Sequence, residues 1–153
     1  MKKILVMSDS HGNKGNVLRA YNRFSDVDCI VHLGDFLKDT ECITANMQVY
    51  TVKGNGDFYL KGKNERVITI GGKKILMLHG HKQRVKTGLL ALGLYAREKA
   101  VDIALFGHTH IPTEQMHQGV LLYNPGSLSG FSKPTVGVIT IDGDNVKIKT
   151  YAL

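Results

Sequence analysis

Residues 3–12 read Lys-Ile-Leu-Val-Met-Ser-Asp-Ser-His-Gly, an apolar run that stops abruptly at a serine, an aspartate and a histidine. An uninterrupted apolar run of this length is typical of a strand buried on both faces, as in the interior of a parallel sheet. The run is too short for the roughly 7–15 apolar residues of a secretion signal and for the roughly 20 of a membrane span. The stretch therefore predicts a first buried strand whose carboxyl end carries polar side chains.

The residues that follow continue with alternating helix and strand signals. Apolar residues recur at helical spacing over 15–24, and a second buried strand is expected over 28–32. A short helix over 40–46 and a third strand over 48–52 come next. This β-α-β-α-β order predicts a parallel sheet with right-handed crossovers.

The second half of the chain is richer in strand signals. Gly71-Gly72 between strands 66–70 and 74–78 predicts a two-residue hairpin turn, and a helix is expected over 86–99, followed by a buried strand over 102–106. We therefore predict an α/β fold of two packed mixed β-sheets flanked by helices, with residues 1–153 forming a single domain. An antiparallel set of strands completes it over 113–117, 120–123, 135–141 and 146–150.

The composition is that of an ordinary globular protein, with 42% hydrophobic and 22% charged residues among 153. These values exclude wholesale disorder, collagen and a coiled coil. The two cysteines, Cys29 and Cys42, form no CxxC pair, so neither a disulfide framework nor a zinc knuckle is expected. We expect a cytoplasmic protein with no membrane partner.

Residues typical of metal ligands follow five of the expected strands, at the point where each strand ends. Ligands of open α/β sheets bind at the carboxyl ends of the strands, so these segments are expected to converge. Five of the seven histidines lie in them, and seven of the 17 glycines lie in them or at Gly126, which indicates tight turns. The segments are Ser8-Asp9-Ser10-His11-Gly12, Gly34-Asp35, Gly54-Asn55-Gly56-Asp57, His79-Gly80-His81 and Gly107-His108-Thr109-His110.

Each segment alone also suits an ordinary solvated turn, but their combination indicates a metal site. Histidine, aspartate and asparagine together suit divalent ions such as Mn²⁺, Fe²⁺ or Zn²⁺, and the lack of cysteine argues against structural zinc. There are enough ligands for two metals, with Asp35 as the natural shared carboxylate. Two ions about 3.5–4 Å apart activate water and clamp phosphate oxygens, which predicts displacement at phosphorus.

The order of these blocks resembles that of the calcineurin-like metallophosphoesterases, namely Asp-x-His, Gly-Asp, Gly-Asn-x-(Asp/Glu), His and Gly-His-x-His. All five blocks occur here between Asp9 and His110. Asn124-Pro125-Gly126-Ser127 fits the family's small bacterial and archaeal phosphodiesterase subgroup, whose fold also occurs in a retromer subunit. The resemblance implies a four-layer α/β/β/α sandwich and a phosphoric diester hydrolase. It implies that a hydroxide bridging two divalent metals attacks a small phosphodiester substrate.

The resemblance also implies a role for each block. It makes Asp35 and Asn55 part of the catalytic centre as well as metal ligands. Mn²⁺ is the ion we expect, with Fe, Zn, Ni and Mg as alternatives. The implied ligands are Asp9, His11 and His110 for one metal, Asn55, His79 and His108 for the other, and Asp35 bridging both.

One position departs from the family pattern. Most phosphatases of the family carry a histidine after the asparagine, thought to protonate the leaving group, whereas this chain has Gly56. The small phosphodiesterase subgroup commonly lacks this histidine as well. We therefore expect aryl esters, whose leaving groups need less protonation, to react far better than alkyl esters. His81 is a candidate for part of the missing acid function, and the alternative is a histidine that supports the ligands or is solvated.

Other polar residues have simpler expected roles. His32 lies inside the second apolar strand and is expected to be a hydrogen-bonded core residue, and His117 is expected at the surface. Asp57 is expected either to orient the loop before it or to cap a turn. Asn124 and Ser127 follow a strand and are candidates to reach the site.

The net charge of +7 favours either a solvated surface or a cationic rim that attracts anionic phosphoesters. Aromatic residues make up only 7% and Trp is absent, so nucleic acid is compatible but not indicated.

Two functions compete with the phosphodiesterase: a catalytically weak protein-interaction scaffold on the same fold, and a nuclease or nucleic-acid binder. A homo-oligomer is compatible with the sequence. The basic residues form two groups, Lys61, Lys63 and Arg66, and Lys82, Arg84 and Lys86.

Overall fold

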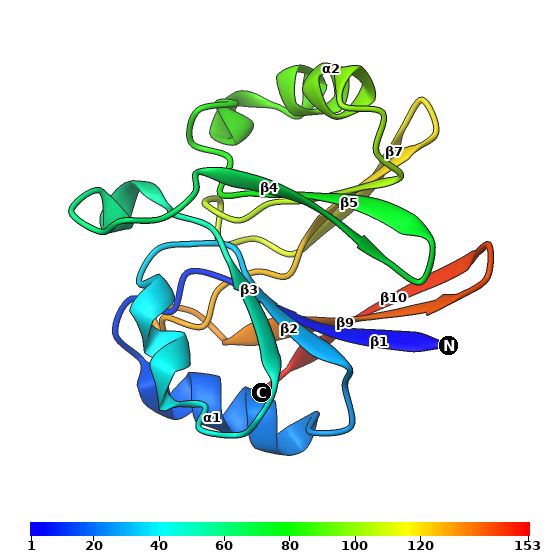
Figure 1. Cartoon of the computed structure of the whole chain (residues 1–153). Coiled ribbons are helices and arrows are strands. Elements are labelled where there is room, and N and C mark those ends of the chain that lie inside the picture. The colour runs from blue at the N-terminus through cyan, green and yellow to red at the C-terminus, as the bar shows by residue number, and fades with distance from the viewer.

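The computed structural model describes all 153 residues and contains two five-stranded β-sheets (Figure 1). The first sheet has the order β10-β9-β1-β2-β3 and the second the order β4-β5-β6-β8-β7. The strands are β1 (Lys2–Met7), β2 (Cys29–His32), β3 (Gln48–Thr51), β4 (Glu65–Ile70), β5 (Lys73–Leu78), β6 (Ile103–Leu105), β7 (Thr113–His117), β8 (Val120–Asn124), β9 (Thr135–Asp142) and β10 (Asn145–Ala152). The helices are α1 (Lys14–Arg23), α2 (Leu90–Glu98) and the short 3₁₀ helices η1 (Leu37–Cys42), η2 (Asn55–Asp57) and η3 (Val85–Thr87).

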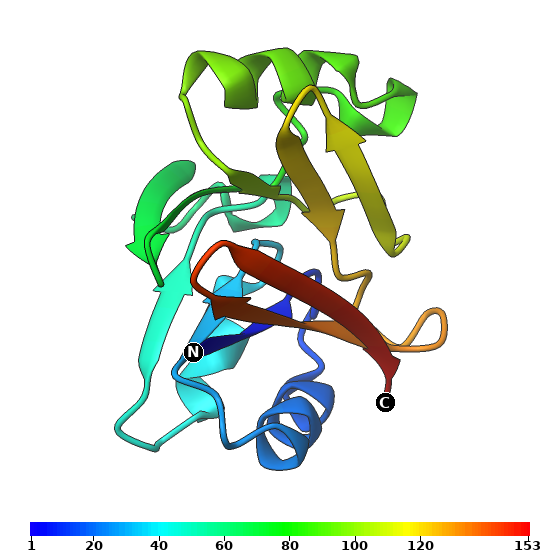
Figure 2. The ribbon, with the colours of Figure 1, turned by 90° about the vertical axis from the view of Figure 1, so that its right-hand side faces the viewer.

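Three apolar clusters hold the layers together. The largest lies between the two sheets, a second joins α1 to the first sheet, and a third joins α2 to the second sheet. Figure 2 shows the resulting stack, with α1 and α2 at opposite outer faces. The predicted sandwich of two mixed sheets with helices outside is confirmed. Neither α-helix combines the length and the apolar character that crossing a membrane requires.

The alternation of side chains along β1 explains its uninterrupted apolar run. Ile4 and Val6 face the core between the sheets, whereas Leu5 and Met7 face the cluster beneath α1. All four are fully buried, because each face of the strand is covered by another layer. β1 pairs in parallel with β2, and β2 pairs in parallel with β3, as predicted.

The second sheet combines parallel and antiparallel pairs. β4 and β5 form the predicted hairpin, and Gly71 and Gly72 turn the chain at φ +58° and +82°, a combination typical of a two-residue hairpin loop. The β7–β8 and β9–β10 pairs are antiparallel, as predicted, but β8 also lies parallel to β6. β5 and β6 are parallel as well, so their carboxyl ends point the same way.

Two helix predictions are wrong at their boundaries. The helix expected over 86–99 begins only at Leu90, because Gly88 has φ +141° and separates it from η3. The helix expected over 40–46 is instead the 3₁₀ helix η1, which begins after Phe36 at φ +69° and ends at the extended Ile43. The Asp39 carboxylate of η1 accepts the Gly12 N–H at 2.8 Å, and this tertiary contact overrides the weak local helix signal.

Candidate metal centre

Loops from both sheets bring the candidate ligands together. In the first sheet, Asp9 and His11 follow β1, and Asp35 follows β2. In the second sheet, His79 follows β5, and residues 107–110 follow β6. Because β1 and β2 are parallel, and β5 and β6 are parallel, the loops that follow each pair lie at the same end of their sheet, the carboxyl ends of the strands. The candidate centre forms where these two edges meet.

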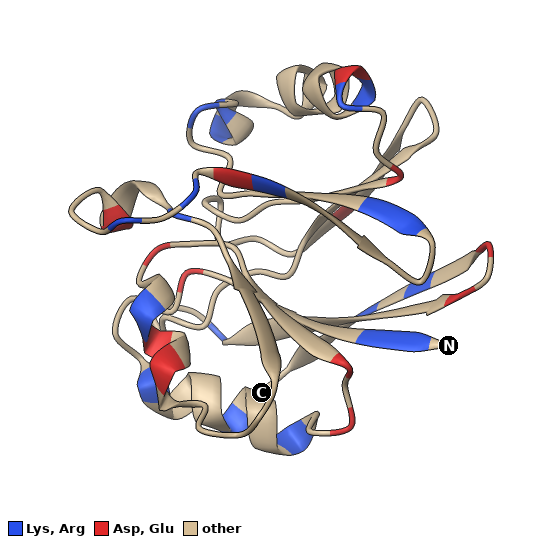
Figure 3. Ribbon diagram, viewed as in Figure 1, with Lys and Arg blue, Asp and Glu red and all other residues tan.

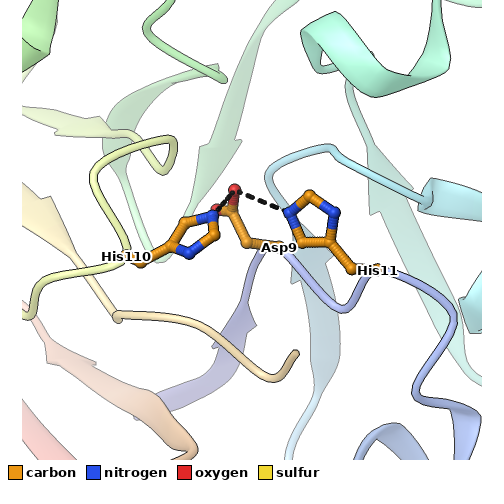
Figure 4. Close-up of side chains that lie close together, drawn as sticks. All are labelled: Asp9, His11 and His110. Atoms are coloured by element: carbon orange, nitrogen blue, oxygen red, sulfur yellow. Dashed lines mark ion pairs between the residues drawn. The ribbon is translucent and has the colours of Figure 1, made fainter. Parts of the chain in front are cut away.

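Asp9, His11 and His110 form the first group of candidate ligands, each offering one atom within 4.8 Å of the others. His110 Nε2 lies 3.0 Å from Asp9 Oδ1, and His11 Nε2 lies 3.7 Å from the same oxygen. Figure 4 shows the two rings pointing at this oxygen from different loops. A carboxylate flanked by two imidazoles is a donor set that suits borderline divalent ions.

Asp9, Asp35 and His79 form the second group, and all three residues are buried. His79 Nε2 lies 3.8 Å from Asp9 Oδ1 and 3.4 Å from Asp35 Oδ1. The other oxygen of Asp35, Oδ2, lies 3.4 Å from His11 Nε2. Asp9 therefore belongs to both groups, and Asp35 faces a histidine of each group with a different oxygen.

His108 lies against the second group. Its Nδ1 is 3.2 Å from His79 Nε2, and its backbone N–H donates to Asp9 Oδ2 at 3.1 Å. Burial, followed by the nearby charges of His79 and Lys86, lowers the pKa of His108 to about 4. The ring is therefore neutral at pH 7, which is the form that binds metal ions.

Asn55 is the one predicted ligand whose side chain has no recorded interaction with the others. Its residue is exposed, and its amide makes no hydrogen bond. Its loop is nevertheless fastened to the centre, since the Gly56 N–H donates to Asp35 Oδ1 at 2.8 Å. Asp57 accepts the Gly54 N–H at 3.0 Å and two further backbone amides at the start of η1, those of Phe36 and Leu37. Of its two expected roles, orienting this loop is the one that these contacts support.

Hydrogen bonds from neighbouring residues fix the ligands. His79 Nδ1 lies 2.8 Å from the Leu33 carbonyl oxygen, an acceptor, so Nδ1 carries the proton and Nε2 is free to face the aspartates. The Ser8 hydroxyl donates to Asp9 Oδ2 at 2.5 Å, and the Ser127 hydroxyl donates to the Asp9 carbonyl at 2.9 Å. Asp9 is thus held by its backbone and by one carboxylate oxygen, which leaves Oδ1 for the centre.

Two other predictions about polar residues are confirmed. Asn124 reaches the site, where its amide donates to the Gly107 carbonyl at 2.9 Å and to Thr109 Oγ1 at 3.0 Å. His32 is fully buried, with Nε2 3.0 Å from the Ser10 hydroxyl. Burial lowers the pKa of His32 to about 4, so this ring is a neutral core residue.

One expectation is wrong and one supporting residue was missed. His117 is half-buried rather than at the surface, and a Cβ at Gly93 of α2 would lie 2.5 Å from its ring. Asp39, only 3% exposed, was missed, although it fixes Gly12 directly after the first ligand loop. No sequence pattern marks Asp39, because its partner is 27 residues away.

His81 lies beside the candidate ligands, as its proposed role requires. Its ring centroid is 5.5 Å from that of His79 and 6.1 Å from that of His108. Its Nδ1 is buried and has no hydrogen-bond partner. Burial, followed by the charges of His79 and Lys82, lowers its pKa.

Two buried polar atoms of the first group lack hydrogen bonds: Asp9 Oδ1 and His11 Nε2. An unpaired buried polar atom costs about 1–3 kcal/mol, and such atoms are otherwise rare. Burial raises the pKa of Asp9, but the imidazoles of His11 and His110 outweigh burial and hold the pKa below its usual range. An ionised carboxylate aimed at an unpaired ring nitrogen fits a divalent cation between them.

The backbone at the ligands is strained. Nine residues other than glycine have positive φ in the whole chain, and five of them are candidate ligands. Such conformations cost of order 1–3 kcal/mol each and concentrate at functional sites. The five are Asp9 (53°), His11 (45°), Asp35 (58°), His108 (69°) and His110 (63°).

Close approach of loops, in addition to turn geometry, explains the glycines of the centre. Gly54 and Gly107 have ordinary φ, so conformational freedom is not their reason. A Cβ at Gly54 would lie 2.1 Å from Asp35 Oδ1, and one at Gly107 would lie 2.1 Å from Ser8 Oγ. The expectation that tight turns account for these glycines is therefore only partly right.

Positive charge borders the centre on the side of the second sheet. Figure 3 shows Lys and Arg in the loop after η2 and around η3, on the side of the molecule toward which β1 and β2 run. Lys86 acts on the pKa of His108, and Lys82 acts on that of His81. Part of the net charge is thus placed where it attracts an anionic ligand.

Comparison with known proteins agrees with this geometry. Residues 1–144 match the family described as the calcineurin-like phosphoesterase superfamily domain. The probable metallophosphoesterase YsnB of Bacillus subtilis is 33% identical, covering 97% of this chain and 89% of the relative. The phosphodiesterase MJ0936 of Methanocaldococcus jannaschii is 32% identical, with 90% and 92% covered.

Solved structures show the same fold. A predicted phosphoesterase from Streptococcus pneumoniae TIGR4 superposes with a TM-score of 0.83 at 30% identity, covering 99% of this chain and 89% of that one. The family match spans nearly the whole chain. This chain therefore belongs to the calcineurin-like phosphoesterase superfamily.

Proposed function

We propose that this chain is a metal-dependent phosphodiesterase. The observation that carries the proposal is the convergence of three histidines and Asp35 on Asp9, whose Oδ1 is buried and has no hydrogen-bond partner. The relative from Methanocaldococcus jannaschii is named a phosphodiesterase, which supports a phosphodiester as the substrate.

The candidate ligands divide into two sets joined by an aspartate. Two divalent ions, when bound, supply positive charge for the phosphate oxygens and acidify the attacking water. Mn²⁺ suits this mixture of carboxylate and imidazole, with Fe, Zn, Ni and Mg as alternatives. The residues that would hold the ions are Asp9, His11 and His110 in one set, His79, His108 and Asn55 in the other, and Asp35 between them; Asp9 also lies within reach of His79 and so of the second ion.

The chain's own contribution is to hold these groups in place before the substrate arrives. Asp9 is fixed by Ser8 and Ser127, and His79 is fixed by the Leu33 carbonyl. Such supporting partners typically contribute 10–100-fold to metal affinity or activity. The centre therefore needs little rearrangement when it binds a phosphate group.

The leaving group receives little help from the first sheet. Gly56 offers no side chain, and a Cβ there would already lie 3.1 Å from Asp35 Oδ1. Burial lowers the pKa of His81, which disfavours the imidazolium that would supply a proton to the leaving group. These two features support a preference for esters whose alcohol leaves as a stable anion, such as aryl esters.

The setting we propose is the cytoplasm. Cys29 is buried and Cys42 half-buried, and both are free thiols rather than partners in a disulfide. Free thiols are typical of proteins kept in a reducing compartment.

Hydrolysis of bis(p-nitrophenyl) phosphate tests the proposed function. Protein stripped of metal is expected to be inactive and to regain turnover when Mn²⁺ is added. Asp35→Ala removes the carboxylate that faces both groups, so turnover is expected to fall by about a thousandfold, since metals contribute several kcal/mol at such sites. The matched control is Asp144→Ala, which removes an exposed carboxylate and is expected to retain full activity. Turnover that ignores Mn²⁺ and equals that of Asp35→Ala would defeat the proposal.

A further inference from the structure

A hollow of about 640 Å³ lies beside the histidine loops and has no part in holding the candidate ions. One wall is the segment 85–89, which contains η3, and the other is formed by residues of the segment 109–113. Phe106, at the end of β6, also lines it. Its size falls within the range of sites that enclose small organic ligands, roughly 300–1,000 Å³.

The hollow is joined to the candidate centre through the chain itself. Thr109, which lines it, lies between the ligands His108 and His110, and its hydroxyl is held by the Asn124 amide at 3.0 Å. Lys86 lines the hollow as well. A molecule whose anionic end lies at the histidines can therefore extend its remainder into the hollow.

The walls of the hollow combine apolar side chains with one positive charge. Val85, Leu89, Phe106 and Ile111 make four of the nine lining residues apolar, and Ile111 is 64% exposed. Lys86 is the single charged residue, and no acidic residue lines the hollow. An exposed isoleucine beside a lysine and the histidine loop suits an apolar group attached to an anion rather than a sugar or a cation.

We propose that this hollow binds the apolar organic group of a phosphoester whose phosphate lies at the candidate metal centre, with Lys86 in the wall of the hollow. The proposal rests on the proposed function and narrows its substrate class to phosphodiesters that carry an aromatic or bulky apolar substituent. It is distinct from the effect of Gly56, which concerns how easily the alcohol leaves and not which group is bound.

Binding of two phosphonates tests the hollow without any turnover. Phenylphosphonate and methylphosphonate share their anionic head and are not hydrolysed, so they differ only in the apolar group. With Mn²⁺-loaded protein we expect phenylphosphonate to bind about tenfold more tightly by calorimetry, since part of the gain from burying a ring is lost to ordering. In protein loaded with Zn²⁺, which does not broaden nearby signals as paramagnetic Mn²⁺ does, we also expect phenylphosphonate, but not methylphosphonate, to shift the NMR methyl signals of Val85, Leu89 and Ile111.

A pair of matched variants locates the effect. Ile111→Asn makes the wall polar at an exposed residue, and Met116→Gln makes the same kind of change at a residue outside the hollow that is 63% exposed. We expect Ile111→Asn to reduce the phenyl-to-methyl affinity ratio several-fold and Met116→Gln to keep it.

The outcomes separate this inference from the proposed function. Metal-dependent turnover together with a phenyl-to-methyl ratio near one, or with methyl shifts that spare the hollow, overturns the hollow and leaves the phosphodiesterase standing. A phenyl-to-methyl affinity ratio near ten that is lost in Ile111→Asn supports binding in the hollow, even if the preparation shows no turnover. Failure of both phosphonates to bind also overturns it.

Discussion

The two sides of the candidate centre supply different chemistry. The loops of the first sheet supply both carboxylates, Asp9 and Asp35, and only one histidine, His11. The loops of the second sheet supply histidines and no carboxylate. Neither side alone contains a complete ligand set, so the centre is a product of the packing of one sheet on the other.

The apolar core between the sheets therefore positions the ligand loops. Ile4 and Val6 of β1 and Ile75 and Met77 of β5 belong to one buried cluster, and each strand leads directly into a ligand loop. Close packing fixes the distance between these strands, and side-chain volume is tightly constrained in such a core. The strained backbone of the ligands is supported by the same packing.

The largest expected effect concerns protonation of the leaving group. Gly56, in a loop of the first sheet, offers no proton donor, whereas His81 lies in a loop of the second sheet. A positioned acid contributes about 10²–10⁴-fold. We expect methyl p-nitrophenyl phosphate to release p-nitrophenol at least about 100-fold faster than methanol. Equal release of the two alcohols would contradict the preference.

His81→Ala sharpens this prediction. If His81 donates a hydrogen bond to the leaving oxygen, the variant is expected to slow the release of methanol by about tenfold while leaving the release of p-nitrophenol nearly unchanged. An unchanged rate of methanol release would show that His81 only supports the ligands.

Met77→Ala tests whether the packing between the sheets holds the centre together. The side chain is fully buried two residues before His79, so we expect the free energy of unfolding to fall by about 2–5 kcal/mol, measured by urea denaturation. We also expect weaker Mn²⁺ binding. Met116→Ala, at an exposed residue, is the control and is expected to change stability by less than about 0.5 kcal/mol. Unchanged Mn²⁺ affinity in a destabilised Met77→Ala protein would separate the packing from the site.

A smaller effect is expected for the pH dependence of stability, and it comes from His32 in β2 of the first sheet. The folded pKa of His32 is about 4, below its ordinary 6.5, so the unfolded chain binds more protons between these values. Stability contributed by His32 is therefore present above pH 6.5 and is lost as the pH falls toward 4, by on the order of 3 kcal/mol.

His32→Gln isolates this contribution. His11 and His79 have raised pKa values and act in the opposite direction, but both are present in the wild type and in the variant. In metal-free protein, urea denaturation at pH 7 and pH 4.5 is expected to show a smaller loss of stability for His32→Gln. The same loss in both proteins would rule out His32 as the cause.

Much of the fold was predictable because short apolar runs and turn residues are local signals. The apolar run of β1 and the Gly71-Gly72 turn each specify their element without help from distant residues. The convergence of the ligands was also predictable, since parallel strands place their carboxyl ends at one edge. The boundaries of η1 and α2 were not, because the Asp39 contact and the conformation of Gly88 depend on the folded chain.

The finer features of the centre lie beyond any sequence pattern. Asp9 and His108 have positive φ at strand ends of different sheets, which no local pattern marks. Gly107 and His108 pack closely against Ser8 and Asp9, residues 99 positions away in the chain. The hollow beside Thr109 likewise needs two segments that only folding brings together. Such features depend on tertiary distances, which local spacing does not encode.

A count of Mn²⁺ ions per chain tests the central claim most directly, because Asp9 belongs to both ligand groups and His110 to only one. After equilibrium dialysis and elemental analysis, we predict two ions in the wild type, one in His110→Asn and none in Asp9→Asn. Asp144→Asn, an exposed control, is predicted to keep two. A wild-type protein that binds no Mn²⁺, or an Asp9→Asn variant that still binds two ions, would contradict the account.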